Sequence, residues 1–210
     1  MKNRLIAPCL AILAVTLACL SLPAGDTPTA TNPPPITLTP STPTPGHPGW
    51  LAYRNESCGF EAQYPPEGTL QETGALHARI DLAFTPGTNL SEKYAQIDVE
   101  AAATPCLSPL ALGYDISALS TSTVTVDGAS FLRQEGADAG AGNFYEWVAY
   151  STSTDCGCVS LSFVLHSLNA MNFPTPPPLF DPVAESAVFD DILSTFVWAP
   201  QGLNVRAILL

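Results

Sequence analysis

The residues most able to carry out chemistry are two cysteines separated by a single glycine, Cys156 and Cys158. Two thiolates this close together suit a soft metal ion such as copper, or a strained disulfide that is easily reduced. Either use needs surroundings that favour the thiolate, whereas the adjacent Asp155 carboxylate disfavours it. We therefore expect both cysteines to form structural disulfides. The alternative is that they serve an extracytoplasmic thiol-redox or soft-metal-binding protein.

Two further cysteines, Cys58 and Cys106, are available as partners once those of the first 22 residues are set aside. Four cysteines in an exported chain indicate two disulfides with three connectivities. A bridge between Cys156 and Cys158 closes too short a loop, which leaves two connectivities open. Of these we predict Cys106 with Cys158 and Cys58 with Cys156, each contributing about 2 to 4 kcal/mol of stability.

Other catalytic patterns lack their essential parts. His166 and Ser167 are, together with several Asp residues, of the types that make a hydrolase triad, but the sequence contains no nucleophile elbow. The glycine-rich stretch 136–142 lacks the lysine and the helix of a phosphate-binding loop. We predict no catalytic residue, no metal site and no cofactor.

The charge balance excludes one class of partner. The 210 residues include 7 Lys and Arg against 19 Asp and Glu, which gives a formal net charge of −12. Such a chain has no basic surface with which to neutralise phosphates, so we expect no nucleic-acid binding. Docking on anionic lipid through charge is excluded for the same reason.

Residues 1–22 have the pattern of a secretory signal peptide. Basic residues precede a long apolar run, and no acidic residue occurs before Asp26. Within the run, residues 16–19 resemble a bacterial lipobox, in which the cysteine, here Cys19, is lipidated and becomes the mature N-terminus. We predict export and membrane anchoring through Cys19. Cleavage after Ala24, which gives a secreted protein, and an uncleaved anchor are the alternatives.

Residues 23–48 are predicted to form a stalk. They are almost entirely Pro, Thr, Ser, Ala and Gly, a composition that cannot bury a core. It favours an extended polyproline II conformation, in which this stretch reaches about 80 Å.

Residues 50–200 are predicted to form a single domain, followed by a tail at 201–210. Asp127 and Gly128 are a hairpin-turn signal, and Pro182 after Asp181 marks the start of a helix. Strand patterns occur at 60–64, 78–84, 94–101, 123–126, 131–134, 144–150, 159–166 and 196–198. These elements predict an α+β fold, with a mainly antiparallel sheet and a C-terminal helix packed on it.

The two ends of this domain resemble the PsbP-like (Mog1/PsbP fold) domains of exported bacterial lipoproteins. The residues that carry the resemblance are Trp50, Tyr53, Asn55, Gly59, Phe60, Tyr64 and Pro65 at the opening, and Phe189, Ile192, Leu193, Thr195 and Phe196 at the close. A third stretch, 139–161, resembles uncharacterised exported bacterial domains. The resemblance implies an antiparallel sheet covered by helices and no established catalytic role.

These features predict a non-enzymatic cell-surface lipoprotein that displays a disulfide-stabilised binding or accessory domain on its stalk. The expected partners are the membrane, through the lipid anchor, and an envelope protein. Asn143, Tyr145 and Trp147 are the candidate binding face, because aromatic residues beside a glycine-rich loop often form contact surfaces. The same side chains also fit a strand core and a turn, which is the competing interpretation.

Overall fold

A computed structural model of the chain describes residues 46–101, 104–115 and 119–198. Several predictions concern residues outside this range and stay predictions: the signal peptide, lipidation of Cys19, cleavage after Ala24, most of the stalk and the tail at 201–210. Within the described residues, no helix combines the length and the apolar character needed to cross a membrane.

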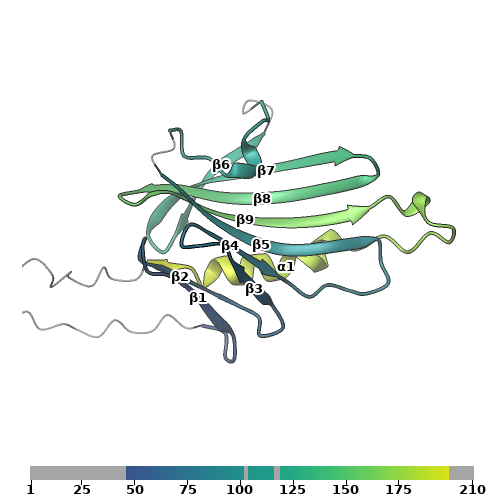
Figure 1. The fold of residues 1–210 in the computed structure, drawn as a ribbon, viewed down its shortest axis with the longest axis horizontal. Coiled ribbons are helices and arrows are strands. Elements are labelled where there is room, and N and C mark those ends of the chain that lie inside the picture. The colour runs from purple at the N-terminus through teal and green to yellow at the C-terminus, as the bar shows by residue number, and fades with distance from the viewer. Residues whose placement is uncertain (1–45, 102–103, 116–118, 199–210) are drawn as a thin grey trace, which may run out of the picture. The chain divides into compact units, whose positions relative to one another are not determined.

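The described residues form ten β-strands, one α-helix and two short 3-10 helices (Figure 1). The strands are β1 (Leu51–Asn55), β2 (Phe60–Tyr64), β3 (Thr69–Glu72), β4 (His77–Asp81), β5 (Leu90–Glu100), β6 (Ser120–Val126), β7 (Ala129–Gly140), β8 (Asn143–Thr154), β9 (Gly157–Leu168) and β10 (Val197–Trp198). The helices are η1 (Pro109–Ala111), η3 (Ala170–Asn172) and α1 (Pro182–Ser194).

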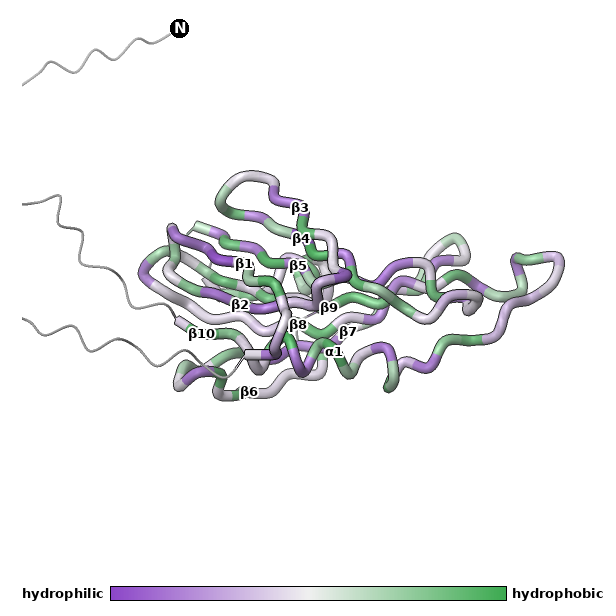
Figure 2. The backbone as a smooth tube through the Cα atoms, turned by 90° about the horizontal axis from the view of Figure 1, so that it is seen from below, coloured by the Kyte–Doolittle hydropathy of each residue, from purple (hydrophilic) through white to green (hydrophobic). Residues whose placement is uncertain are grey.

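Seven strands form a large antiparallel sheet in the order β3-β4-β5-β9-β8-β7-β6, which can be followed across Figure 2. Successive side chains of a strand point to opposite faces. On β9, Leu161 and Phe163 belong to the main hydrophobic core, whereas Ser162 and His166 lie on the opposite side. We call the first side the inner face and the second the outer face.

The inner face is covered by α1 and by a small sheet in which β2 lies between β1 and β10. Aromatic rings join the three parts: Phe163 of β9 stacks on Phe189 of α1 with centroids 4.8 Å apart. Phe60 of β2 stacks on Phe196 at 5.4 Å. Burial of these large rings contributes much of the hydrophobic stabilisation that holds α1 on the sheet.

α1 begins at Pro182, directly after Asp181, as the sequence predicts. The Asp181 carboxylate accepts hydrogen bonds from the backbone nitrogens of Val183 and Ala184, and Pro182 occupies the first turn, where no donor is needed. This capping satisfies amides that have no partner within the helix. The predicted position of the helix is confirmed.

A buried ion pair also holds α1 to the sheet. Lys93 Nζ of β5 lies 2.9 Å from Glu185 Oε2, and the two side chains are 7% and 5% exposed. The second Glu185 oxygen accepts a hydrogen bond from the Thr85 backbone nitrogen at 2.9 Å. Burial alone would raise the pKa of Glu185, but the bonds from Thr85 and Lys93 outweigh it, so this pKa lies below its ordinary value.

The outer face is partly covered by the segment 104–115. Leu107 and Ala111 of this segment pack with Tyr94, Trp147 and Val164 of the sheet in a second hydrophobic cluster. The central part of the sheet is therefore buried on both faces, which explains why β9 is buried along nearly its whole length.

The predicted α+β class is wrong. The described part of the chain is β-rich, with two antiparallel sheets and a single helix of 13 residues. The helix-covered sheet implied by the resemblance is replaced by a sheet covered by one helix together with a second sheet. The strand patterns missed β1 and β3, because β3 has no buried residue, while β1 exposes Leu51 and buries the polar Asn55, so neither strand alternates apolar with polar residues.

The glycine-rich stretch 136–142, interpreted above as a loop, is mostly part of β7. β7 continues in register with β8 as far as Gly140, and only Ala141 and Gly142 turn the chain, both with positive φ. A Cβ atom at Gly136 would overlap the indole of Trp147, which lies across this position from β8. Glycine therefore makes room for an aromatic side chain on the neighbouring strand.

Candidate functional site

An open groove lies on the inner face beside α1, and we call it the α1 groove. Its larger hollow has a volume of about 550 Å³. Val148 of β8, Phe163 and Leu165 of β9 and Phe189 of α1 give it an apolar floor. This size and this lining are typical of sites that bind small molecules or peptide side chains.

Charged side chains line the larger hollow as well. Arg133 and Glu135 of β7 form an ion pair, with side chains 31% and 43% exposed, and Glu146 of β8 is exposed nearby. Arg133 Nε also lies 3.3 Å from the Tyr150 hydroxyl, to which it donates. Because solvent weakens such an exposed ion pair, Arg133 and Glu135 remain able to exchange partners with a ligand.

A smaller hollow of about 320 Å³ lies between the other end of β6 and the last turns of α1. Its lining includes Val126 of β6, Asp190 and Leu193 of α1 and Val197 of β10. The two hollows thus lie along the same helix, and each is bounded by one end of β6.

Sequence reasoning missed the α1 groove. Its floor residues show the alternation that predicts any half-buried strand, and α1 carries an ordinary apolar stripe. Which part of the sheet the helix leaves uncovered depends on packing between segments distant in sequence, and no local pattern reports it.

The three residues of the predicted binding face lie at alternate positions of β8 and share the outer face. Tyr145 stacks on His166 with centroids 4.2 Å apart and an interplanar angle of 8°. Asn143 Oδ1 lies 2.9 Å from Nε2 of the same imidazole. Trp147 is 6% exposed and in edge contact with Tyr114 of the covering segment, in the cluster against which Tyr145 also packs. The structure therefore joins Asn143 and Tyr145 to His166 and assigns Trp147 to the second core cluster.

His166 is held in a network rather than presented to a substrate. Its Nδ1 lies 2.9 Å from Glu92 Oε2, so both ring nitrogens have protein partners. Glu92 also accepts from Arg79, whose guanidinium lies 3.7 Å above the Tyr94 ring. A general acid or base needs a ring nitrogen that reaches the substrate. Ser167 is on the opposite face of β9, so it does not form a hydrolase pair with His166.

Two disulfides join Cys58 to Cys156 and Cys106 to Cys158. The predicted presence of two disulfides is confirmed, and the pairing is the one favoured above. Cys156 and Cys158 belong to different bridges, and Gly157 between them has a φ of 133°, a conformation that favours glycine. In this oxidised chain neither sulfur is available as a thiolate for metal binding or disulfide exchange.

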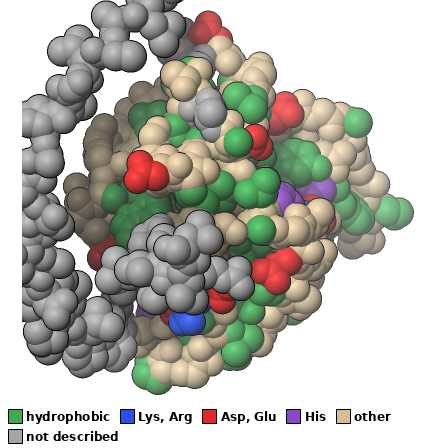
Figure 3. Space-filling model, turned by 60° about the vertical axis from the view of Figure 1, so that its left-hand side comes forward, with side chains coloured by type: hydrophobic (Ala, Val, Ile, Leu, Met, Phe, Trp, Pro, Cys, Tyr) green, Lys and Arg blue, Asp and Glu red, His purple; other side chains and the backbone are tan. Residues whose placement is uncertain are grey.

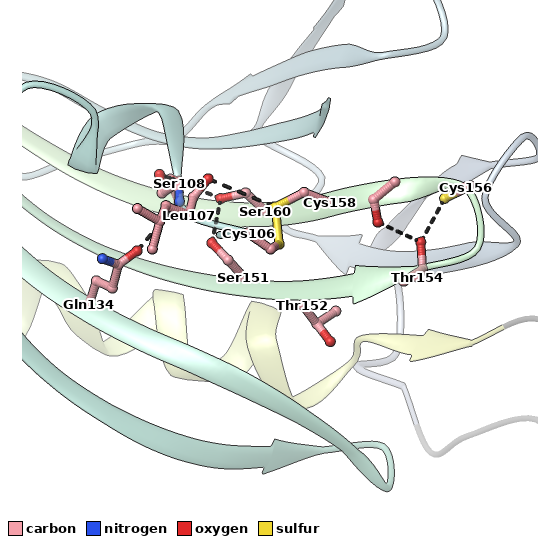
Figure 4. Close-up of a disulfide and its surroundings, with 12 residues drawn as sticks. Cys106, Leu107, Ser108, Gln134, Ser151, Thr152, Thr154, Cys156, Cys158 and Ser160 are labelled. Atoms are coloured by element: carbon pink, nitrogen blue, oxygen red, sulfur yellow. Dashed lines mark hydrogen bonds between the residues drawn. A yellow bond between two sulfur atoms is a disulfide. The ribbon is translucent and has the colours of Figure 1, made fainter. Parts of the chain in front are cut away.

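The Cys106–Cys158 bridge fixes the covering segment to the sheet (Figure 4). Two residues after Cys106, the Ser108 hydroxyl lies 2.8 Å from that of Ser162 on β9. The Ser108 backbone nitrogen donates to Gln134 Oε1 of β7. A covalent bond and buried hydrogen bonds therefore act together, and this bridge has a structural role.

Acidic side chains lie among hydrophobic ones on the face of the domain seen in Figure 3, where basic side chains are scarce. In residues 46–101, 104–115 and 119–198, no group of three or more His, Cys, Asp or Glu side chains is arranged to hold a metal ion. The surface charge agrees with the net charge of −12 and would repel an acidic partner.

No family model and no curated protein matches the chain. Among solved structures, it is similar to a crystal structure from Bacteroides thetaiotaomicron VPI-5482, with a TM-score of 0.42 and 12% sequence identity. The match covers 72% of this chain and 49% of that one, so this chain spans about half of that protein's length. A likeness at this level carries no argument about function.

Proposed function

We propose that this chain is an exported, non-enzymatic binding module, held at the outer side of the cell membrane by a lipid on Cys19. Residues 23–48 would separate the domain from the membrane by as much as about 80 Å. The two disulfides are consistent with a non-cytoplasmic protein, because such bonds persist in oxidising compartments.

The observation that supports a binding role is the α1 groove. Its apolar floor consists of the nearly buried Phe163, Leu165 and Phe189 together with the partly exposed Val148, and charged groups that can orient a ligand line its opening. A large, well-formed apolar hollow with a few polar groups is the preferred site for a ligand on a protein surface. The groove therefore replaces Asn143, Tyr145 and Trp147 as the proposed contact surface.

The non-enzymatic part of the proposal rests on how the reactive side chains are used. His166 has both nitrogens bonded to protein groups, and the four cysteines of the domain are closed in disulfides. The groove itself is lined by Arg133, Glu135 and Glu146 without a histidine or cysteine among its described residues. This set suits orientation of a ligand better than nucleophilic attack.

A photo-reactive benzoylphenylalanine in place of Ser186, which lines the larger hollow, tests the proposal in the cells that export the chain. The matched control carries the same group in place of Ser91, an exposed serine of β5 that lines neither hollow. Irradiation should give a discrete adduct from position 186 and none from position 91. No adduct from position 186, or equal adducts from both positions, contradicts binding in the groove.

A further inference from the structure

β6 is an open edge of the large sheet, because it pairs with β7 and with nothing else in the described part of the chain. Its seven residues, Ser120–Val126, include no charged residue and no proline, and their register with β7 is unbroken. Proteins usually protect an exposed edge with charges, prolines or bulges. The edge formed by β6 has none of these protections.

The hairpin between β6 and β7 determines which backbone groups face the open edge. Asp127 and Gly128 have φ values of 47° and 75°, as in a two-residue type I′ turn. Val126 and Ala129 flank this turn and are therefore a hydrogen-bonded pair. Bonded and non-bonded pairs alternate along an antiparallel ladder. Every second residue of β6, beginning at Thr121, thus directs its N–H and C=O away from β7.

The outward-bonding residues are Thr121, Thr123 and Thr125. Their N–H and C=O groups form a row about 14 Å long, at about 3.4 Å per residue. Their side chains are exposed, whereas the intervening Ser122 and Val124 lie on the inner face, the side of the α1 groove. The edge therefore presents the hydrogen-bonding pattern that an additional antiparallel strand requires.

The α1 groove runs beside this same edge. Ser120, at the start of β6, lines the larger hollow, and Val126, at its end, lines the smaller one. These two positions are separated by about 20 Å in an extended strand. Ser186 and Leu193 of α1 line the same two hollows from the helix. A strand added to β6 would direct every second side chain toward the groove.

We propose that the α1 groove binds an extended polypeptide segment of another protein, which pairs with β6 as an eighth strand of the large sheet. This inference rests on the proposed function and deepens it, because it names the ligand class of the same groove. Backbone hydrogen bonds to Thr121, Thr123 and Thr125 supply affinity. Inward side chains at alternate positions lie beside Ser120 and Val126, where the two hollows meet β6, and supply selectivity.

The charges of the groove select a basic segment. Glu135, Glu146 and Asp190 are among the described residues that line the two hollows, and Arg133 is the single cation there and is paired with Glu135. A second copy of the chain would bring the same acidic groups to the shared edge, and each copy has a net charge of −12. Repulsion disfavours that occupant, whereas Lys and Arg in a partner segment are attracted.

Selection of a displayed library of random decapeptides on the full-length oxidised chain tests strand addition. Thr123→Pro removes one outward N–H and leaves the ladder to β7 intact, because proline is tolerated where the N–H faces solvent. The matched control, Thr123→Val, keeps the N–H and the branched side chain. Selected peptides should alternate apolar and polar residues, carry surplus Lys and Arg, and bind T123P about tenfold more weakly, with T123V within about twofold of the unaltered chain.

Hydrogen exchange supplies an independent measurement. The amides of Thr121, Thr123 and Thr125 should exchange rapidly in the unbound chain and become protected by a selected peptide. Should T123P fail to fold, Thr121→Pro removes an equivalent outward N–H near the start of β6. Equal binding to the proline variant and the unaltered chain, or absence of protection at the three amides, overturns strand addition.

The same peptides distinguish strand addition to β6 from the broader proposal that the α1 groove is a binding site. Ser186→Trp fills the larger hollow. Peptides weakened by S186W but insensitive to T123P would keep the groove as the binding site and show that the ligand class is wrong. No enriched peptide, or peptides unaffected by S186W, would contradict both proposals. A native mass that is dimeric for the unaltered chain and monomeric for T123P identifies a second copy as the occupant and overturns the inference.

Discussion

Replacement of Lys93 by methionine should destabilise the domain strongly, because it leaves the buried Glu185 carboxylate without its counterion. The two side chains are 7% and 5% exposed and their charged atoms are 2.9 Å apart. Breaking a buried pair by removing one partner costs about 3 to 5 kcal/mol. For a domain of this size the unfolding midpoint should fall by about 6 to 20 °C.

Urea unfolding of the oxidised full-length chain at pH 7 measures this cost for K93M, E185Q and the double variant K93M/E185Q. The double variant buries no charge at this site, and the amide oxygen that E185Q introduces can still accept the hydrogen bond from the Thr85 backbone nitrogen. It should therefore lose less free energy of unfolding than K93M alone, by about 2 kcal/mol. Arg54→Met is the matched surface control: its pair with Glu61 is 2.6 Å long, but the arginine side chain is 63% exposed, so we expect little change.

The pH dependence of stability has a defined sign. The pKa of Glu185 is lower in the folded chain than its ordinary value, so its contribution is complete above the unfolded pKa and is lost as the pH falls through the folded one. Below about pH 5, the unaltered chain should therefore lose stability faster than E185Q. A K93M cost below about 1 kcal/mol, or strictly additive single and double effects, would refute the reasoning.

Three further changes test the disulfide, the sheet and the helix. Opening the 52-residue loop with Cys106→Ser and Cys158→Ser should lower the free energy of unfolding by about 4 kcal/mol, measured in urea, and a loss below about 1 kcal/mol would contradict a structural bridge. Gly136→Ala should cost about 1 to 3 kcal/mol, because its methyl group meets an indole ring, whereas Gly140→Ala on the same strand has open space and should change stability by less than about 0.5 kcal/mol; equal effects would be inconsistent with the packing described. Asp181→Ala should cost about 1 kcal/mol in thermal unfolding through loss of the helix cap, and an unchanged midpoint would argue against that cap.

Local chemistry in the sequence was sufficient to predict the elements that depend on neighbouring residues. Asp127 and Gly128 predicted the hairpin, and Pro182 after Asp181 predicted the start of α1. The count of cysteines predicted two disulfides, and the single residue between Cys156 and Cys158 argued against a bridge between them, but neither distinguished between the two remaining pairings. In each case a steric or hydrogen-bonding requirement acts over a few residues, so the pattern is visible in the sequence.

Features that depend on distant segments were not predictable in this way. Lys93 and Glu185 are 92 residues apart, and neither neighbourhood indicates that their side chains meet. The loop interpretation of Gly136 is wrong because its partner, Trp147, belongs to the next strand. The α1 groove has the same origin, since it exists only where α1 leaves part of the large sheet uncovered. Packing between distant segments determines the ion pair, the contact at Gly136 and the groove. It also determines the β-rich architecture.

An intact mass of the membrane-extracted chain, with thiols alkylated before and after reduction, tests most directly whether this protein is a tethered, oxidised scaffold. The expected result is a mature N-terminus at Cys19 that carries acyl mass, with no thiol of the domain alkylated until reductant is added. An N-terminus at Gly25 without acyl mass would contradict the tether. Alkylation of Cys156 and Cys158 before reduction would contradict the structural disulfides and favour thiol-redox or soft-metal chemistry instead.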